Sequence, residues 1–169
     1  QLNILKTNFN KANITELPFS KQNISMFRYT HLKDKPPIFT SEEARGSNYI
    51  VNANKIVYVA YVVKVEDYQE LITQFEDMLP GIPLQTHFHM TIGFYLKPFP
   101  KIQLAKLPDE ITCDITKILV TKDNGLALTE VILNKDVKRE LSNLGVDFTY
   151  KKKKKILDKD LHFTLGTNP

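Results

Sequence analysis

The clearest pattern in this chain is a change from apolar runs to helical spacing and back, and it occurs twice. Residues 57–64, VYVAYVVK, are rich in β-branched and aromatic side chains and predict a buried strand. Residues 65–79 place apolar side chains at helical spacing, and Pro80-Gly81 predicts the end of that helix. Residues 86–95, THFHMTIGFY, then alternate between apolar and polar positions, as a strand does.

The second half of the chain repeats this order. Residues 114–122 and 126–133 predict a hairpin, because the Asn-Gly pair between them favours the positive φ angles of a tight turn. Residues 134–145 predict a short helix that ends at Gly145, and residues 161–166, LHFTLG, predict a final strand. The repeat predicts an α+β fold in two antiparallel-sheet lobes with flanking helices, related by an approximate two-fold around a central cleft.

The first 55 residues lack a comparable pattern. They are rich in Asn, Lys and Ser and include the break Lys35-Pro36-Pro37, so we expect a lead-in or linker segment that packs on the core. Residues 56–169 then form the domain, with the boundary between its lobes near residues 100–112. Because the chain begins with Gln1 and not with Met, we expect either a piece of a longer polypeptide or a processed chain.

Composition narrows the class of protein. A chain of 169 residues with 42% hydrophobic and 25% charged residues fits one globular domain. The sequence contains no run of about 18 apolar residues, the length that predicts a membrane-spanning helix. The single cysteine, Cys113, excludes a disulfide framework and favours an intracellular setting, in the cytoplasm or nucleus. The net charge of +4 is compatible with an anionic partner such as RNA but does not require one.

The two closing strands carry the same triplet, His-x-Thr: His89 with Thr91, and His162 with Thr164. Side chains two positions apart lie on the same face of a strand, so each His shares a face with its Thr. The opposite face is apolar and is expected to pack against helices; it holds Phe88, Met90, Ile92, Leu161, Phe163 and Leu165. A glycine follows each threonine by two positions and leaves room for a ligand or for a close backbone approach.

Two facing imidazoles form a natural acid–base pair for phosphodiester hydrolysis. One histidine removes a proton from the nucleophile and the other protonates the leaving oxygen. Two threonine hydroxyls can bind the non-bridging phosphate oxygens, and the scheme requires no metal or other cofactor. A single His-x-Thr triplet is unspecific and is usually a structural feature of a strand, but the matched strand context and the trailing glycines favour a paired site.

The pair HMTIGF and HFTLGT resembles the two signature motifs of the 2H phosphoesterase superfamily. The resemblance covers about residues 55–169 and is strongest to the C-terminal cyclic phosphodiesterase domain of fungal tRNA ligases. It implies hydrolysis of RNA 2′,3′-cyclic phosphate ends to a 3′-hydroxyl and a 2′-phosphate during tRNA splicing. It further implies tRNA exon halves as partners, and a monomer joined covalently to kinase and ligase domains in the full-length chain.

The resemblance also implies roles for individual residues. His89 and His162 become the catalytic pair, and Thr91 and Thr164 the phosphate ligands. By analogy, His162 is the base and His89 the acid. Phe94 matches an aromatic that stacks on a base in some relatives, although a regular strand would turn it toward the core.

Three further features allow alternative interpretations. The lysine run that includes Lys151 and Lys153 is either a solvated loop or a contact for the RNA backbone, and the neighbouring Tyr150 either stacks on a base or packs within that loop. His87, His89 and His162 could be imagined as a zinc site, but that would leave the two threonines unexplained. His31 lies in the lead-in and receives no role.

Rival functions share this fold or this cleft. A 3′ RNA exonuclease and a 2′-5′ oligonucleotide phosphodiesterase would carry the same two motifs. A catalytically silent module that binds RNA ends would keep the cleft, but intact His and Thr in both motifs argue against it.

Overall fold

The computed structural model describes residues 13–32, 56–94 and 102–168. Its elements, in chain order, are β1 (Ile14–Leu32), β2 (Ile56–Val63), α3 (Val65–Met78), β3 (His89–Phe94), the 3-10 helix η3 (Leu104–Lys106), β4 (Glu110–Thr121), β5 (Leu126–Ile132), α4 (Lys135–Asn143), β6 (Thr149–Lys152), β7 (Lys155–Asp158) and β8 (His162–Thr167). The fold is α+β, as predicted, with antiparallel pairing throughout the described strands.

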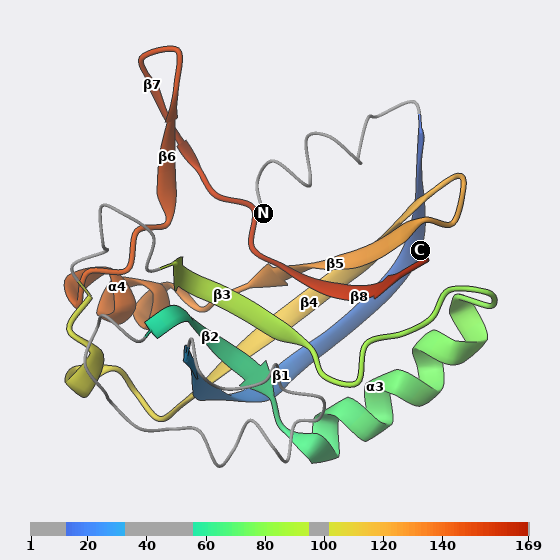
Figure 1. Ribbon diagram of the computed structural model, residues 1–169, viewed down its shortest axis with the longest axis horizontal. Helices are drawn as coiled ribbons and strands as arrows, with labels where there is room; N and C mark the ends of the chain where they lie inside the picture. The colour runs from blue at the N-terminus through green and yellow to red at the C-terminus, as the bar shows by residue number, and fades with distance from the viewer. Residues whose placement is uncertain (1–12, 33–55, 95–101, 169) are drawn as a thin grey trace.

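Six of the strands form one sheet in the order β3-β2-β1-β4-β5-β8 (Figure 1). The order reflects a repeated unit of strand, strand, helix and strand: β1, β2, α3 and β3 in the first half, and β4, β5, α4 and β8 in the second. The two units join where β1 pairs with β4, in the middle of the sheet. The strands that carry the two His-x-Thr triplets therefore occupy the two edges.

The prediction of an irregular lead-in is wrong for residues 14–32, because β1 is a central strand of 19 residues. Two register shifts interrupt its pairing with β4 and hide the alternation that marks a strand. Pro18 lies in the first shift, where a proline is tolerated within a sheet, and Asn23 lies in the second with a φ of 58°. The remainder of that predicted segment lies outside the described residues. Of the predicted lobe boundary near residues 100–112, residues 102–112 are described, and they hold η3 and the start of β4.

One face of the sheet packs against both helices. Leu71 and Phe75 of α3 and Leu141 of α4 belong to the same buried cluster as Tyr61 and Met90 of the sheet. Both ends of α4 have residues suited to helix ends. At its start the Asn134 side chain accepts a hydrogen bond from the N–H of Asp136, and after its end Gly145 adopts a φ of 102°. No helix in the described ranges is long and apolar enough to span a membrane.

The sheet curves until its two edges approach each other. Phe88, just before β3, stacks on Phe163 of β8 with ring centroids 6.4 Å apart. The loop before β3 also reaches β8 directly, because Leu84 forms an isolated antiparallel bridge with Gly166 and the N–H of Gln85 donates to the Leu165 carbonyl at 2.7 Å. These contacts bring the two triplet-bearing strands together from opposite ends of the sheet.

Candidate active site on the two edge strands

Each His-x-Thr triplet lies on the face of its strand that turns away from the helices. Phe88, Met90, Phe163 and Leu165 are buried in the cluster that contains the helices, as the alternation predicted. His89 pairs with Val62, which belongs to a second, smaller cluster on the opposite face together with Phe27 and Tyr29. Neighbouring side chains of a strand point to opposite faces, so the histidines and threonines of both motifs share the face that the helices leave open.

Both motifs end in the same irregularity. Thr91 pairs with Ala60 and Gly93 with Val59, so Ile92 has no partner in the ladder. In the other strand, Thr164 pairs with Leu128 and Gly166 with Ala127, and Leu165 is passed over in the same way. A bulge of this kind bends a strand and redirects its side chains, and it is frequent beside active sites. The glycine of each motif therefore lies at a β-bulge, in the same position relative to its threonine.

Gly166 shows why the second motif needs a glycine. A Cβ atom built there would lie 2.3 Å from the backbone oxygen of Pro83 and 2.9 Å from Cγ2 of Ile82. Of the two reasons considered for this glycine, the structure shows a close approach of backbone.

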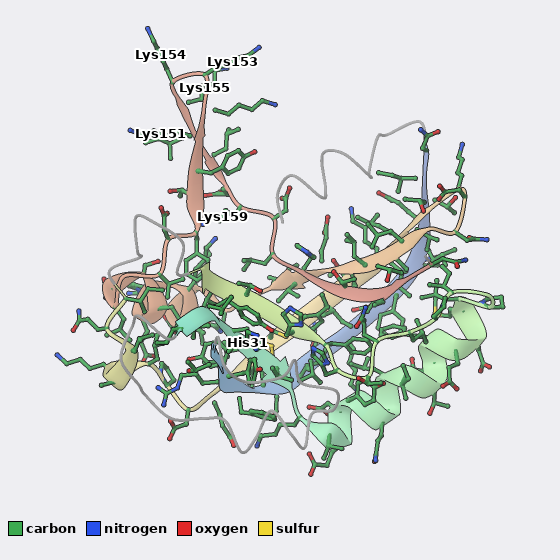
Figure 2. All side chains as sticks on the ribbon, viewed as in Figure 1. His31, Lys151, Lys153, Lys154, Lys155 and Lys159 are labelled. Carbon is green, nitrogen blue, oxygen red and sulfur yellow. The ribbon has the colours of Figure 1, made fainter. Side chains whose placement is uncertain are left out.

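A row of stacked rings includes His89, and the sequence did not predict it. His87 stacks on His89 with ring centroids 5.2 Å apart, and Tyr58 also stacks on His89, at 5.9 Å. Tyr58 in turn stacks on His31 at 4.8 Å, and the Tyr29 hydroxyl lies 2.8 Å from Nδ1 of His31. Figure 2 marks His31 within the sheet. The available signal was the alternation of Tyr29 and His31, which only becomes meaningful once residues 14–32 are recognised as a strand.

Burial and neighbouring charge determine the titration of the two motif histidines. Burial, followed by the charges of His87, His162 and His31, lowers the pKa of His89 to about 4. Burial also lowers the pKa of His162, but a hydrogen bond opposes it: Nδ1 lies 3.3 Å from the carbonyl oxygen of Asp160, an acceptor that favours the protonated ring. At neutral pH His89 is thus held neutral, and His162 is the better placed of the two to carry a proton.

This arrangement predicts a loss of stability in acid. His89 takes up a proton near pH 6.5 when unfolded but only near pH 4 when folded, so protons favour the unfolded chain between these values. The free energy of unfolding should fall by about 3 kcal/mol from this group as pH drops through that window. Urea unfolding across the window would measure it, with His89→Asn as the matched variant of shallower slope. Equal slopes for the two proteins would contradict the burial of a neutral His89.

The other predicted contact residues are not brought together with the motifs. Tyr150, Lys151 and Lys153 lie in a separate two-stranded hairpin, β6–β7. The two lysines are exposed, as the prediction of a solvated segment has it, but the segment is a hairpin and not a loop. The backbone of Phe94 pairs with Tyr58 beyond the β3 bulge, so the assumption of a regular strand fails there; its side chain lies outside the described residues. Within the described ranges, no three His, Cys, Asp or Glu side chains are grouped as metal ligands.

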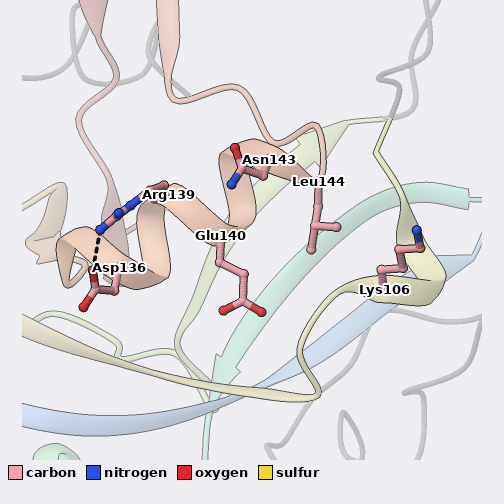
Figure 3. Close-up of a pocket in the computed structure, with 6 residues that line it drawn as sticks. All are labelled: Lys106, Asp136, Arg139, Glu140, Asn143 and Leu144. Atoms are coloured by element: carbon pink, nitrogen blue, oxygen red, sulfur yellow. Dashed lines mark hydrogen bonds and ion pairs between the residues drawn. The ribbon is translucent and has the colours of Figure 1, made fainter.

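Two cavities are defined elsewhere on the molecule. One of about 320 Å³ lies between α4 and η3 (Figure 3), with a lining of Lys106, Asp136, Arg139, Glu140, Asn143 and Leu144. Its basic and acidic groups are mixed, and Arg139 pairs with Asp136. A second, of about 330 Å³, lies at the C-terminal end of α3. Neither includes a residue of the two motifs, and the second has Glu76 as the one charged residue of its lining.

No protein-family model matches the sequence, no curated protein matches it, and no solved structure matches the fold. The proposed function therefore rests on the geometry of the chain's own residues and on the likeness of its two triplets to the 2H phosphoesterase motifs.

Proposed function

We propose that this protein is a cyclic phosphodiesterase with the bilobal fold of the 2H phosphoesterases, and that it hydrolyses RNA 2′,3′-cyclic phosphate ends. One observation carries the proposal: two His-x-Thr triplets lie on edge strands that meet, on the same face of the sheet, each followed by the same bulge. The repeated strand-strand-helix-strand unit supports a two-fold relation between the halves.

In the proposed reaction, a water oxygen attacks the phosphorus and the bond to O3′ breaks. One histidine accepts the proton of the water, and the other gives its proton to O3′, which leaves as a hydroxyl while the phosphate stays on O2′. Thr91 and Thr164 donate hydrogen bonds to the non-bridging oxygens, whose negative charge grows as the water attacks.

The pKa order favours a different division of labour from the one that the resemblance implies. A general base must be unprotonated before the reaction, and His89, with a pKa of about 4, meets that condition at neutral pH. A general acid must hold a proton; burial lowers the pKa of His162 as well, but the Asp160 carbonyl opposes that shift by accepting a hydrogen bond from its ring. We therefore assign His89 as the base and His162 as the acid.

The product identifies the reaction. With a synthetic RNA that ends in a 2′,3′-cyclic phosphate, and with EDTA present, we expect a 2′-phosphate and a 3′-hydroxyl on an RNA of unchanged length. Gel mobility before and after phosphatase treatment, checked by mass spectrometry, distinguishes the outcomes. Shortened RNA would instead indicate an exonuclease, cleavage of a 2′-5′ linked oligonucleotide alone would indicate the other phosphodiesterase, and binding without turnover would indicate a silent module.

A further inference from the structure

The β6–β7 hairpin stands apart from the main sheet and projects from the body of the protein (Figures 1 and 2). Its base is fixed: the Asp147 carboxylate accepts from both the N–H and the hydroxyl of Thr149, and the N–H of Lys159 donates to the carbonyl of the buried Phe148. Every residue from Lys151 to Asp160 is exposed. The hairpin is therefore a defined arm on a firm base, and its second strand leads within a few residues to His162.

The turn of this hairpin is unfavourable for folding. Lys153 and Lys154 both have positive φ angles, 48° and 68°, a turn that normally selects Asn-Gly. Each residue with a side chain costs roughly 1–2 kcal/mol in this conformation. The same chain uses a suitable residue at its other tight hairpin, where Asn124 takes the positive φ between β4 and β5. Lysines at the β6–β7 tip are thus explained by their charge and not by the stability of the turn.

The hairpin also accounts for the positive charge of the whole chain. The sequence has 23 Lys and Arg residues against 19 Asp and Glu, so without Lys151 to Lys155 it would have 18 basic against 19 acidic residues. Within the described part of the chain, none of these five lysines forms an ion pair. Five exposed ammonium groups on one short ribbon form a strong local site for a polyanion.

The distribution of side chains favours one polyanion over another. Lys151 lies opposite Ile156 on one face, while Tyr150 lies opposite Leu157 on the other, and Lys152 pairs with Lys155. Ile156 is 68% exposed and Leu157 37%, but the two point to opposite faces and form no single apolar surface for a bilayer. Lysines on both faces and at the tip instead suit a nucleic acid, whose backbone phosphates can run along either face of the ribbon.

We propose that the β6–β7 hairpin is an RNA-binding arm that contacts the sugar–phosphate backbone through Lys151 to Lys155. The choice of RNA rests on the proposed function. The arm would contact the RNA strand away from its reacting end, so it would favour polymeric RNA over a cyclic mononucleotide as the substrate.

Salt dependence of binding tests the arm without using catalysis. The probe is a labelled single-stranded RNA that ends in a 3′-hydroxyl, and fluorescence anisotropy measures its affinity. Five phosphate contacts contribute about 3.5 to the slope of log affinity against log salt. Between about 50 and 200 mM salt, the wild-type protein should thus lose roughly 100-fold more affinity than a variant with Lys151 to Lys155 replaced by Gln.

A second variant separates binding from folding. Lys153→Asn with Lys154→Gly removes two charges but supplies the preferred turn, so it should raise the free energy of unfolding while lowering the salt slope by about 1.4. Lys122→Gln with Lys135→Gln removes the same charge from exposed positions elsewhere and should leave the slope nearly unchanged.

Three outcomes would overturn the proposal of an RNA-binding arm. The five-lysine variant and the wild type could have equal salt slopes, or the two double variants could change the slope equally. The five-lysine variant could also lose binding to phosphatidylserine vesicles while its binding to the RNA probe is unchanged. Because the probe is not a substrate of the proposed reaction, the arm and the phosphodiesterase can each fail while the other stands.

Discussion

Replacing either motif histidine with alanine should reduce hydrolysis of a 2′,3′-cyclic phosphate end by about 1,000-fold, since each removes one of the two proton transfers. The rate of the double variant should be only slightly lower than that of either single variant. The two histidines act as a unit, so once one is lost the other contributes little to catalysis. Initial rates with the cyclic-phosphate RNA measure this, and circular dichroism confirms that each variant is folded.

The threonines offer a matched pair on one strand. Thr164→Ala removes a proposed phosphate ligand, whereas Thr167→Ala alters an exposed residue at the end of the same strand. Only the first substitution, Thr164→Ala, should lower the rate.

Full activity in both histidine variants would remove the basis for the proposed reaction.

A sulfur leaving group reports which histidine is the acid. The sulfur of a 3′-thio substrate can leave as a thiolate without being protonated. This substrate should therefore restore turnover to His162→Ala but not to His89→Ala. The reverse pattern would mean that a bound phosphate overrides the pKa order of the free protein, and it would return His89 to the role of acid.

Gly166→Ala should unfold more readily than the wild type by about 3 kcal/mol, because its new methyl group must displace backbone and not a flexible side chain. The added carbon would overlap the Pro83 carbonyl oxygen, which lies 2.3 Å away. Urea unfolding at neutral pH measures the change.

Gly81→Ala is the matched control for this effect. Gly81 has a φ of +86° but nothing within 4 Å of the new Cβ, so it should lose only about 1 kcal/mol through backbone strain. If the two variants lost equal stability, the tight contact between β8 and the loop before β3 would not exist in solution.

The sequence predicted the parts of this fold whose signals are local. β2, α3, β3, α4 and β8 follow runs and spacings within single elements, and the orientation of His89 and His162 follows from the alternation on their strands. The β4–β5 hairpin followed from its turn residues, with Asn124 at positive φ.

Features that depend on pairing between distant segments were not predictable in this way. β1 lost its alternation to two register shifts that only its partner β4 defines. The stack of His31 on Tyr58 needs β1 beside β2, and the need for Gly166 arises from Pro83, far away along the chain. The β6–β7 hairpin was missed because its turn uses lysines where a local rule expects Asn-Gly.

The strand order β3-β2-β1-β4-β5-β8 places equivalent strands of the two units at equal distances from the β1–β4 junction. A symmetric homodimer of one unit would build the same order, with its first strands paired antiparallel at the dimer axis. The chain thus has the architecture of such a dimer fused into a single polypeptide. In a homodimer the two histidines would be identical by symmetry, whereas fusion allows each to acquire its own surroundings. The ring stack at His89 and the Asp160 carbonyl at His162 are two such surroundings, and the proposed reaction uses this difference, with His89 as the base and His162 as the acid.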